Sequence, residues 1–111
     1  MRNINQEEWL ELVANDSSAV IIDVRMLEEC IEGIIKNAII IDFLDAPKFK
    51  IEIEKLDKDK NYYVYCRSGN RSSRACRLLE GIGVESTYNL IGGMLSWTGI
   101  QVIPTKHNFI S

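Results

Sequence analysis

Short apolar runs alternate with longer segments of mixed polarity along this chain. The runs AVIIDV (19–24), AIII (38–41) and YYVYC (62–66) are rich in β-branched or aromatic residues and too brief to form helices of their own. Unbroken apolar runs of this length are typical of strands that are buried on both faces of a sheet. We expect one further strand at 84–90.

Between these runs the apolar spacing changes to that of helices. Ala75, Leu78, Leu79 and Ile82 fall at i, i+3, i+4 and i+7, which predicts one apolar stripe on a helix that ends at Gly83. Further helices are expected at 5–13, 26–32, 44–56 and 93–98. The alternation predicts an α/β fold with a parallel sheet flanked by helices on both faces. Ligands of such sheets bind at the carboxyl ends of the strands, which is where Cys66 falls.

Length and composition indicate an ordinary globular chain. With 111 residues, 46% of them hydrophobic and 26% charged, residues 1–111 are expected to form a single domain. No apolar run approaches the roughly 20 residues that span a bilayer, and the start MRNINQEEWL is polar and acidic, unlike a signal peptide. We therefore expect a cytoplasmic protein without a membrane partner.

The distribution of charge is more informative than its sum. A net charge of -3 disfavours a nucleic-acid partner. Four of the six arginines nevertheless fall between Arg67 and Arg77, and no Asp or Glu occurs from Lys60 to Leu79. This segment therefore predicts a local positive field around Cys66 that attracts a small anion. For Arg74 and Arg77, a merely solvated helix face is an equal alternative.

The three cysteines, Cys30, Cys66 and Cys76, are an odd number without paired spacing. The pattern predicts neither a disulfide scaffold nor a zinc site, so we expect free thiols and no metal.

Of these thiols, Cys66 has the surroundings of a reactive one. A free cysteine titrates near pH ~8.5 and reacts as the thiolate, so it needs positive potential nearby. A helix beginning near Ser72 would direct its unpaired amides at Cys66, and the small Ser68 and Gly69 allow the chain to curl into an anion-binding nest. The alternative is an inert, buried structural cysteine.

Three separated patterns resemble the rhodanese-like sulfurtransferases. IIDVRMLEE resembles their first signature, YVYCRSGNRSSRACRLLEGIG their catalytic loop, and YNLIGGMLSW their C-terminal signature. The patterns D-V-R-x-x-x-E, C-x-x-G-x-R-S and L-x-G-G-x-x-x-W occur in the family's order and cover nearly the whole chain. The resemblance implies a three-layer domain with a five-stranded parallel sheet and no metal or organic cofactor. It also implies that a cysteine takes sulfur from a donor such as thiosulfate, becomes a persulfide and passes the sulfur to a thiophilic acceptor such as cyanide or a thiol.

The resemblance assigns roles to particular residues. Cys66 matches the nucleophile and persulfide carrier, and Asp23 and Arg25 match residues expected to tie the first strand's end to neighbouring loops. Trp97 and the Gly92–Gly93 pair are expected to provide packing and a tight turn. The residues whose amides are expected to hold the outer sulfur of the substrate are Arg67, Ser68, Gly69, Asn70 and Arg71. Arg71 is also expected to have a structural share.

The chain departs from the family's usual pattern at Gly33-Ile34-Ile35, where Gly-His-Ile is common, and at Cys30, where an aromatic residue is common. Neither position holds the nucleophile, so we expect altered packing and intact chemistry. Cys30 is either a small buried hydrophobe, the preferred interpretation, or a thiol that resolves the persulfide. Cys76 is expected in the core, and His107 on the surface without a catalytic role.

Two other functions compete with sulfur transfer. Phosphatases with a related loop use C-x5-R, whereas four residues separate Cys66 from Arg71, and no recognisable general acid is present. A persulfide carrier or interaction module fed by a protein partner is the stronger alternative. The expected partners are therefore a small anionic sulfur donor and a thiol or cyanide acceptor, with a protein donor or acceptor as the alternative; the sequence names none of them.

Overall fold

A computed structural model describes residues 1–109 of the chain. Five strands form one parallel sheet in the order β1-β6-β5-β2-β4. They are β1 (Arg2–Ile4), β2 (Ala19–Asp23), β4 (Ile39–Ile40), β5 (Asn61–Tyr65) and β6 (Ser86–Leu90). The predicted α/β fold with a five-stranded parallel sheet is confirmed.

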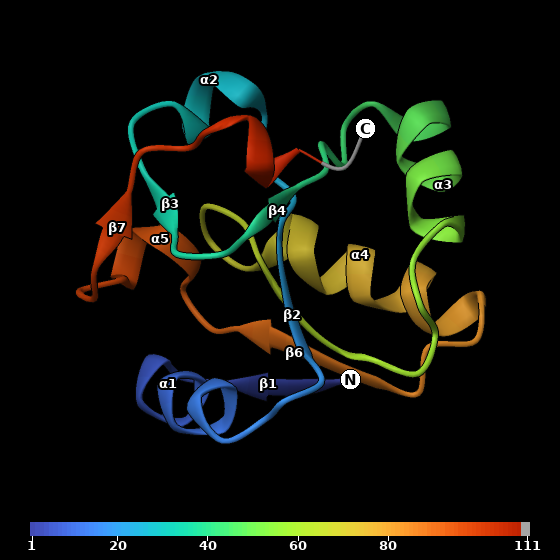
Figure 1. Cartoon of the computed structure of the whole chain (residues 1–111), viewed down its shortest axis with the longest axis horizontal. Coiled ribbons are helices and arrows are strands. Elements are labelled where there is room, and N and C mark those ends of the chain that lie inside the picture. The colour runs from blue at the N-terminus through green and yellow to red at the C-terminus, as the bar shows by residue number, and fades with distance from the viewer. Residues whose placement is uncertain (110–111) are drawn as a thin grey trace.

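Helices cover both faces of this sheet, as predicted. α1 (Gln6–Ala14) and α5 (Gly93–Ser96) lie on one side of the strands, and α3 (Ala46–Glu54) and α4 (Asn70–Gly81) on the other (Figure 1). The short α2 (Leu27–Cys30) follows β2. The Asn5 side chain caps α1 by accepting a hydrogen bond from the Glu8 N–H at 2.9 Å.

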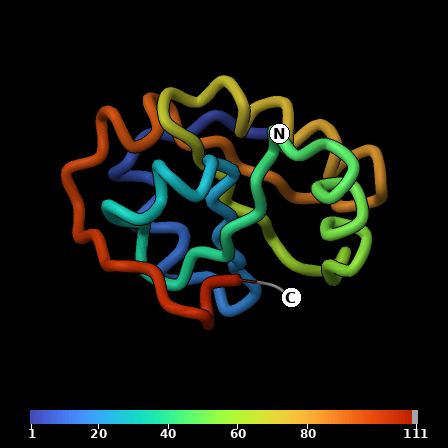
Figure 2. The backbone as a smooth tube through the Cα atoms, turned by 90° about the horizontal axis from the view of Figure 1, so that it is seen from above, coloured from blue at the N-terminus to red at the C-terminus, as the bar shows by residue number. Residues whose placement is uncertain are grey.

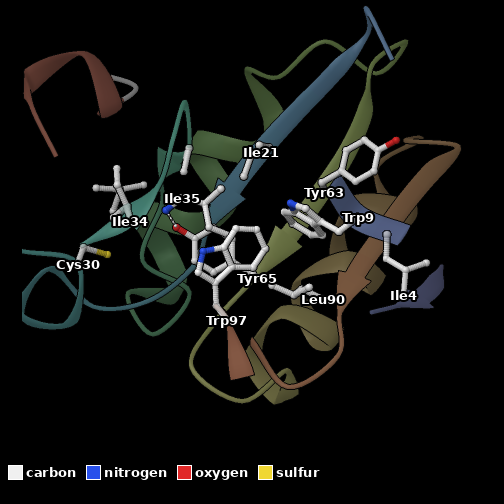
Figure 3. Packing of buried hydrophobic residues seen from close by; sticks show 12 residues of the cluster. Ile4, Trp9, Ile21, Cys30, Ile34, Ile35, Tyr63, Tyr65, Leu90 and Trp97 are labelled. Carbon is white, nitrogen blue, oxygen red and sulfur yellow. Dashed lines mark hydrogen bonds between the residues drawn. The ribbon is translucent and has the colours of Figure 1, made fainter. Parts of the chain in front are cut away.

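Side-chain alternation along the strands separates the core into two clusters. In β5, Tyr63 and Tyr65 point to the side of α1, whereas Tyr62 and Val64 point to the side of α3 and α4. Figure 3 shows the first cluster, where Trp9 of α1 packs edge-on against Tyr63 with ring centroids 5.5 Å apart. Because both faces are buried, the central strands β2 and β5 are largely apolar in the sequence.

The structure adds strands that the apolar pattern did not predict. β1 has three residues, of which only Ile4 is buried, so it has no apolar run to mark it. Its backbone nevertheless pairs in register with β6, from Arg2 opposite Tyr88 to Ile4 opposite Leu90. β3 (Ile34–Ile35) and β7 (Gln101–Val102) form a separate antiparallel pair of two residues each.

Several helix boundaries also differ from the predictions. α3 begins at Ala46 and accommodates Pro47 in its first turn, where no amide partner is lost. α2 is shorter than the expected 26–32, because Met26 is its extended N-cap and Ile31 is already its C-cap. α5 ends at Ser96, since Trp97 has an extended backbone.

The C-terminal segment runs along the outside of the molecule past β3 and β4 (Figure 2). A 3₁₀ turn, η1 (Lys106–Asn108), lies beside β4, and the Asn108 side-chain amide donates a hydrogen bond to the Ala38 carbonyl at 2.8 Å. Within residues 1–109, no helix is long and apolar enough to cross a membrane.

Candidate active site

Cys66 lies at the carboxyl end of β5, at the centre of the sheet's carboxyl edge. The residue before it, Tyr65, accepts a backbone hydrogen bond from Val24 at 3.0 Å, and the Cys66 carbonyl accepts one from Met94 at 3.0 Å. Only 1% of Cys66 is exposed. Neighbouring strands and α5 therefore fix the backbone that carries the sulfur.

Gly69 turns the chain back toward that sulfur. Its φ of 104° lies in the left-handed region that favours glycine, and it caps α4, which begins at Asn70. The Gly69 N–H donates to Cys66 Sγ at 3.0 Å. The predicted nest and helix terminus are thus present, but the helix starts two residues before Ser72, so Asn70 and Arg71 belong to its first turn.

Ser72 connects Cys66 to a buried polar residue of β6. Its Oγ lies 3.3 Å from Cys66 Sγ and 2.5 Å from Asn89 Oδ1. The Asn89 side-chain amide donates to the Gly69 carbonyl at 3.2 Å and to Asn3 Oδ1 at 2.9 Å. Asn89 therefore orients both the serine and the turn that hold the sulfur.

These contacts favour the thiolate form of Cys66. Burial acts to raise the pKa of the thiol, because a charge loses solvation in the protein interior. Hydrogen bonds from the Ser72 hydroxyl and from the N–H groups of Ser72, Gly69 and Ser68 outweigh burial, and the pKa lies below its ordinary value. The hydrogen bonds therefore favour the thiolate, which is the form in which a cysteine reacts.

Arg71 joins the loop to α2. Its Nη1 and Nη2 donate to Glu29 Oε1 at 2.7 Å and Oε2 at 2.9 Å, with each side chain 19% exposed. Glu29 Oε1 also accepts the Met26 N–H at 3.0 Å. The hydrogen bond from Arg71 lowers the pKa of Glu29, so the pair stays charged at neutral pH. This ion pair is the contact through which Arg71 can have the structural role expected of it.

Asp23 and Arg25 form a buried pair beneath the site. The Arg25 Nη2 donates to Asp23 Oδ2 at 2.7 Å and to the Gly33 carbonyl at 2.8 Å. The guanidinium also lies over the Tyr65 ring, 5.6 Å from its centroid. Tyr65 in turn accepts the Ile35 N–H at 3.0 Å, the dashed bond in Figure 3. The pair thus ties the end of β2 to neighbouring loops, in the geometry that the sequence predicts.

The Gly92–Gly93 turn packs directly on the loop. Gly93 has a φ of 51°, and a Cβ there would overlap the Cys66 carbonyl oxygen and lie 2.7 Å from the Arg67 backbone. The Leu95 N–H donates to the Arg67 carbonyl at 3.0 Å. Trp97 is 8% exposed and donates through Nε1 to the Ile100 carbonyl at 3.3 Å. These residues have the turn and packing geometry that the sequence predicts.

The outer side of the loop is polar and open. Arg67, Ser68 and Asn70 are exposed, whereas Gly69 and Arg71 are half-buried. On α4, the exposed Arg74 lies over the Phe43 ring, 5.2 Å from its centroid. The loop therefore presents cationic and hydrogen-bonding groups to whatever approaches Cys66.

The other two cysteines are not part of this site. Cys30 packs in the cluster beside α1 and Cys66 in the one beside α4, so the sheet separates them. Burial raises the pKa of Cys30 and of Cys76 to about 12. Both thus have the environment of small buried hydrophobes, and His107 is exposed in η1.

Three residues of the site were not singled out from the sequence. Glu29 and Ser72 are the last letters of two quoted patterns, D-V-R-x-x-x-E and C-x-x-G-x-R-S, which was a usable signal. The signal for Asn89 is weaker: it is a polar residue between Tyr88 and Leu90 on a predicted strand. Asn3, its hydrogen-bond partner, lies on the strand that was not predicted.

Named relatives match along most of the chain. "Putative sulfurtransferase YtwF" of Bacillus subtilis is 39% identical over 89% of this chain and 92% of its own length. "Sulfurtransferase" of Allochromatium vinosum is 30% identical over 93% and 95%. The crystal structure of a rhodanese-like domain protein from Staphylococcus aureus has a TM-score of 0.80 and 29% identity, over 95% of this chain and 100% of that one.

Longer relatives have other names. "Putative sulfur carrier protein YrkF" of Bacillus subtilis is 31% identical over 86% of this chain and half of its own length. A tRNA uridine(34) hydroxylase of Acaryochloris marina is 33% identical over 85% of this chain and 31% of its own length. The model of the rhodanese-like domain matches residues 6–100. With the site geometry and these relatives, that match places the chain in the rhodanese-like domain family.

Proposed function

We propose that this protein is a sulfurtransferase that moves a sulfane sulfur from a donor such as thiosulfate to cyanide or a thiol through a persulfide on Cys66. The observation that carries the proposal is the environment of Cys66 Sγ. It accepts the Gly69 N–H at 3.0 Å, lies 3.3 Å from the Ser72 hydroxyl and has a lowered pKa. A loop that stabilises one anionic sulfur is suited to the persulfide anion that follows from it.

In the first half-reaction the Cys66 thiolate attacks the outer sulfur of thiosulfate. A bond forms between the two sulfurs, the S–S bond of thiosulfate breaks, and sulfite leaves with the electron pair. Cys66 becomes a persulfide anion, so the total charge is unchanged. Because only 1% of Cys66 is exposed, a donor with a slender terminal sulfur suits the site.

In the second half-reaction an acceptor attacks the outer sulfur of the persulfide. Cyanide gives thiocyanate and a thiolate gives a new persulfide, while the bonding pair returns to Cys66 as thiolate. Covalent catalysis speeds the transfer because it replaces one difficult step by two easier displacements. The exposed Arg67 and Asn70 and the N–H groups of the loop would hold the donor's negative charge, with Arg71 fixing the loop through Glu29.

The position of Arg71 disfavours a phosphatase. In a phosphate cradle the arginine must face the substrate, whereas here both Nη atoms of Arg71 are bonded to Glu29. A persulfide carrier fed by a protein partner is the second candidate, and the relative named as a sulfur carrier favours it. A carrier would load sulfur and release it slowly except to its partner, so turnover with small acceptors separates the two.

The test is the intact mass of the reduced protein after brief exposure to thiosulfate, followed by cyanide. We expect a gain of one sulfur atom that cyanide removes, and thiocyanate formed over many turnovers. Cys66→Ser should lose this gain while keeping its fold, whereas Cys30→Ser and Cys76→Ser should retain it. Loading that persists in Cys66→Ser, or no loading of a folded and reduced protein, would contradict the proposed thiosulfate chemistry.

A further inference from the structure

A pocket of about 240 Å³ lies at the carboxyl edge of the sheet, between β4, the start of α2 and α3. Its walls are largely apolar, but three carboxylates and a single lysine also line it. The apolar residues are Leu27, Ile40, Ile41, Phe49 and Phe109, and the charged ones are Asp42, Asp45, Lys48 and Glu52. The pocket thus combines an apolar wall with a negative balance of charge.

Glu52 is the unusual member of this group. It is 5% exposed, and its Oε2 atom is buried without a hydrogen-bond partner among residues 1–109. Its other oxygen, Oε1, accepts the exposed Lys55 Nζ at 3.2 Å. A buried carboxylate oxygen without a donor is costly, so it calls for a partner that the chain does not itself provide. Glu52 is one of the residues that line the pocket, and the terminal torsion of a glutamate is soft, so rotation of the carboxylate can present an oxygen to a bound cation.

The lining selects the class of partner. Among the described residues, no group of three or more acidic, histidine or cysteine side chains converges as a metal ion would require. Apolar walls suit a carbon stem, and the rings of Phe49 and Phe109 can attract a cation over their faces. Carboxylates and aromatic rings together suit an organic cation better than a bare ion.

Two lysines of the chain compete with such a cation: Lys55, which bonds to Glu52 Oε1, and Lys48, which lines the pocket. Lys48 is exposed on α3, four residues before Glu52, and the described ion pairs do not include it. An exposed lysine pays side-chain entropy to hold one position, so an incoming cation with a shorter stem can displace it.

The pocket is close to Cys66 along the sheet edge. The Ile41 N–H bonds to the Asp23 carbonyl at 2.9 Å, and the Val24 N–H bonds to the Tyr65 carbonyl at 3.0 Å. The pocket wall therefore follows β4 and the nucleophile follows β5, and β2 lies between these two strands. Two strand spacings amount to about 10 Å.

We propose that this pocket is a binding site for an ammonium or guanidinium group on a short apolar stem, with Glu52 as its main counter-ion. The group belongs either to a free amine or to a basic side chain of a protein, and its attachment here would hold the rest of the ligand beside Cys66. Binding does not depend on sulfur transfer, so the site is tested separately from the proposed function.

The experiment titrates the whole chain with n-butylammonium chloride, with backbone amide chemical shifts as the readout. We expect saturable shifts at Ile41, Asp42, Phe49 and Glu52, with a dissociation constant on the order of 1–10 mM. Ammonium chloride at equal ionic strength lacks the apolar stem and so measures how much the stem contributes to binding. n-Butanol lacks the positive charge and so measures how much the charge contributes. Both should bind at least about tenfold more weakly.

Variants assign the effect to Glu52. Glu52→Gln keeps the shape of the side chain and should weaken n-butylammonium binding at least about tenfold. Glu54→Gln, an exposed change on the same helix, is the matched control and should bind as the natural sequence does. Lys48→Met should bind more tightly, because one of the two competing cations is removed while Lys55 stays in place. Equal affinity in a folded Glu52→Gln, or equal binding of n-butanol, would overturn the proposal.

A second pair of probes identifies the source of the cation. Spermidine represents a free amine, and a short peptide with one central lysine and blocked ends represents a protein side chain. The probe that binds more tightly identifies the source of the cation, provided that its binding is lost in Glu52→Gln. Binding of neither would overturn the site, whatever the intact-mass experiment shows for Cys66.

Discussion

At the scale of single residues, the proton of the Ser72 hydroxyl has two competing acceptors. Asn89 Oδ1 lies 2.5 Å away and Cys66 Sγ 3.3 Å away. When the thiol is protonated, the Ser72 hydroxyl donates to Asn89 and accepts from Cys66. When Cys66 is a thiolate, the hydroxyl can donate its one proton to the sulfur only if it gives up the hydrogen bond to Asn89. Asn89 therefore influences the charge of the nucleophile without touching it.

Asn89→Asp should raise the pKa of Cys66. A carboxylate holds the Ser72 proton more strongly than an amide oxygen does, adds a negative charge near the sulfur and removes the donor to the Gly69 carbonyl. The pKa is read from the ultraviolet absorbance of the thiolate as pH is raised, with Cys66→Ser as the blank.

Asn3→Asp is the control for charge alone. Asn3 only accepts from Asn89, and an aspartate can keep that hydrogen bond, so its effect on the thiol should be much smaller. If the thiol of Asn89→Asp titrates at or below the pH of the natural sequence, the competition for the serine proton is wrong.

At the scale of elements, the Glu29–Arg71 pair couples α2 to the start of α4. We expect Arg71→Ala and Glu29→Ala each to lower the free energy of unfolding by about 1–3 kcal/mol and to slow persulfide loading, because the loop loses its anchor. In the double mutant the losses should be less than additive, with a coupling energy of at least about 0.5 kcal/mol from urea unfolding. Strictly additive losses would mean that the two side chains act separately.

The turn before α5 gives a second prediction at this scale. Gly93→Ala puts a Cβ against the backbone of Cys66 and Arg67 at a φ of 51°, so we expect lower stability by at least about 1 kcal/mol and impaired loading. Gly81, at the end of α4, has no atom within 4 Å of its missing Cβ. Gly81→Ala should instead leave stability unchanged or raise it by up to about 1 kcal/mol, with full loading. Equal effects of the two changes in thermal unfolding would contradict this account of the turn.

The elements that the sequence predicted are those that carry their own signal. β5 and β2 are apolar except for one terminal residue each because both faces are buried, and α4 shows its stripe because one side packs on the sheet. β1 is defined by its pairing with β6, and nothing within Arg2–Ile4 reports that pairing. The start of α4 was placed late because the left-handed conformation of Gly69, which begins the helix, is not visible in the residue type alone.

At the scale of the whole molecule, the same contrast applies to the site. Cys66 and its loop are contiguous, so one stretch of sequence brings them together. Glu29 and Asn89 reach the loop from two other segments of the chain, and Asn3 holds Asn89 from a third. Their contacts depend on strand order, because β6 lies beside β5 and β1 beside β6. That order is a property of the packed sheet and has no local trace in the residues.

The ionisable groups of the whole molecule predict how its stability changes with pH. On the acid side, two carboxyl groups have a lowered pKa. Burial acts to raise the pKa of Asp16, but hydrogen bonds from Asn61 and Tyr63 outweigh burial and the net shift is downward. A hydrogen bond from Arg71 lowers the pKa of Glu29. A carboxylate with a lowered pKa in the folded state stabilises the fold above its unfolded pKa of about 4. That contribution is lost as pH falls through the folded value. The free energy of unfolding should therefore decrease as the pH is lowered below about 4.5.

On the alkaline side the sign is opposite. Burial raises the pKa of Cys30 and Cys76 to about 12 and also raises that of Tyr65. The unfolded chain releases these protons near pH ~8.5 for cysteine and ~10 for tyrosine, so the fold loses stability as pH rises above about 8.5.

Cys66, with its lowered pKa, acts in the opposite sense, so Cys66→Ser is the suitable protein for measuring the alkaline decline. Urea midpoints should form a plateau from about pH 5 to 8 and decline on both sides, and Cys30→Ser should flatten the alkaline decline. A midpoint that stays constant from pH 8 to pH 10 would mean that the buried thiols and phenols ionise as readily in the folded chain as in the unfolded one.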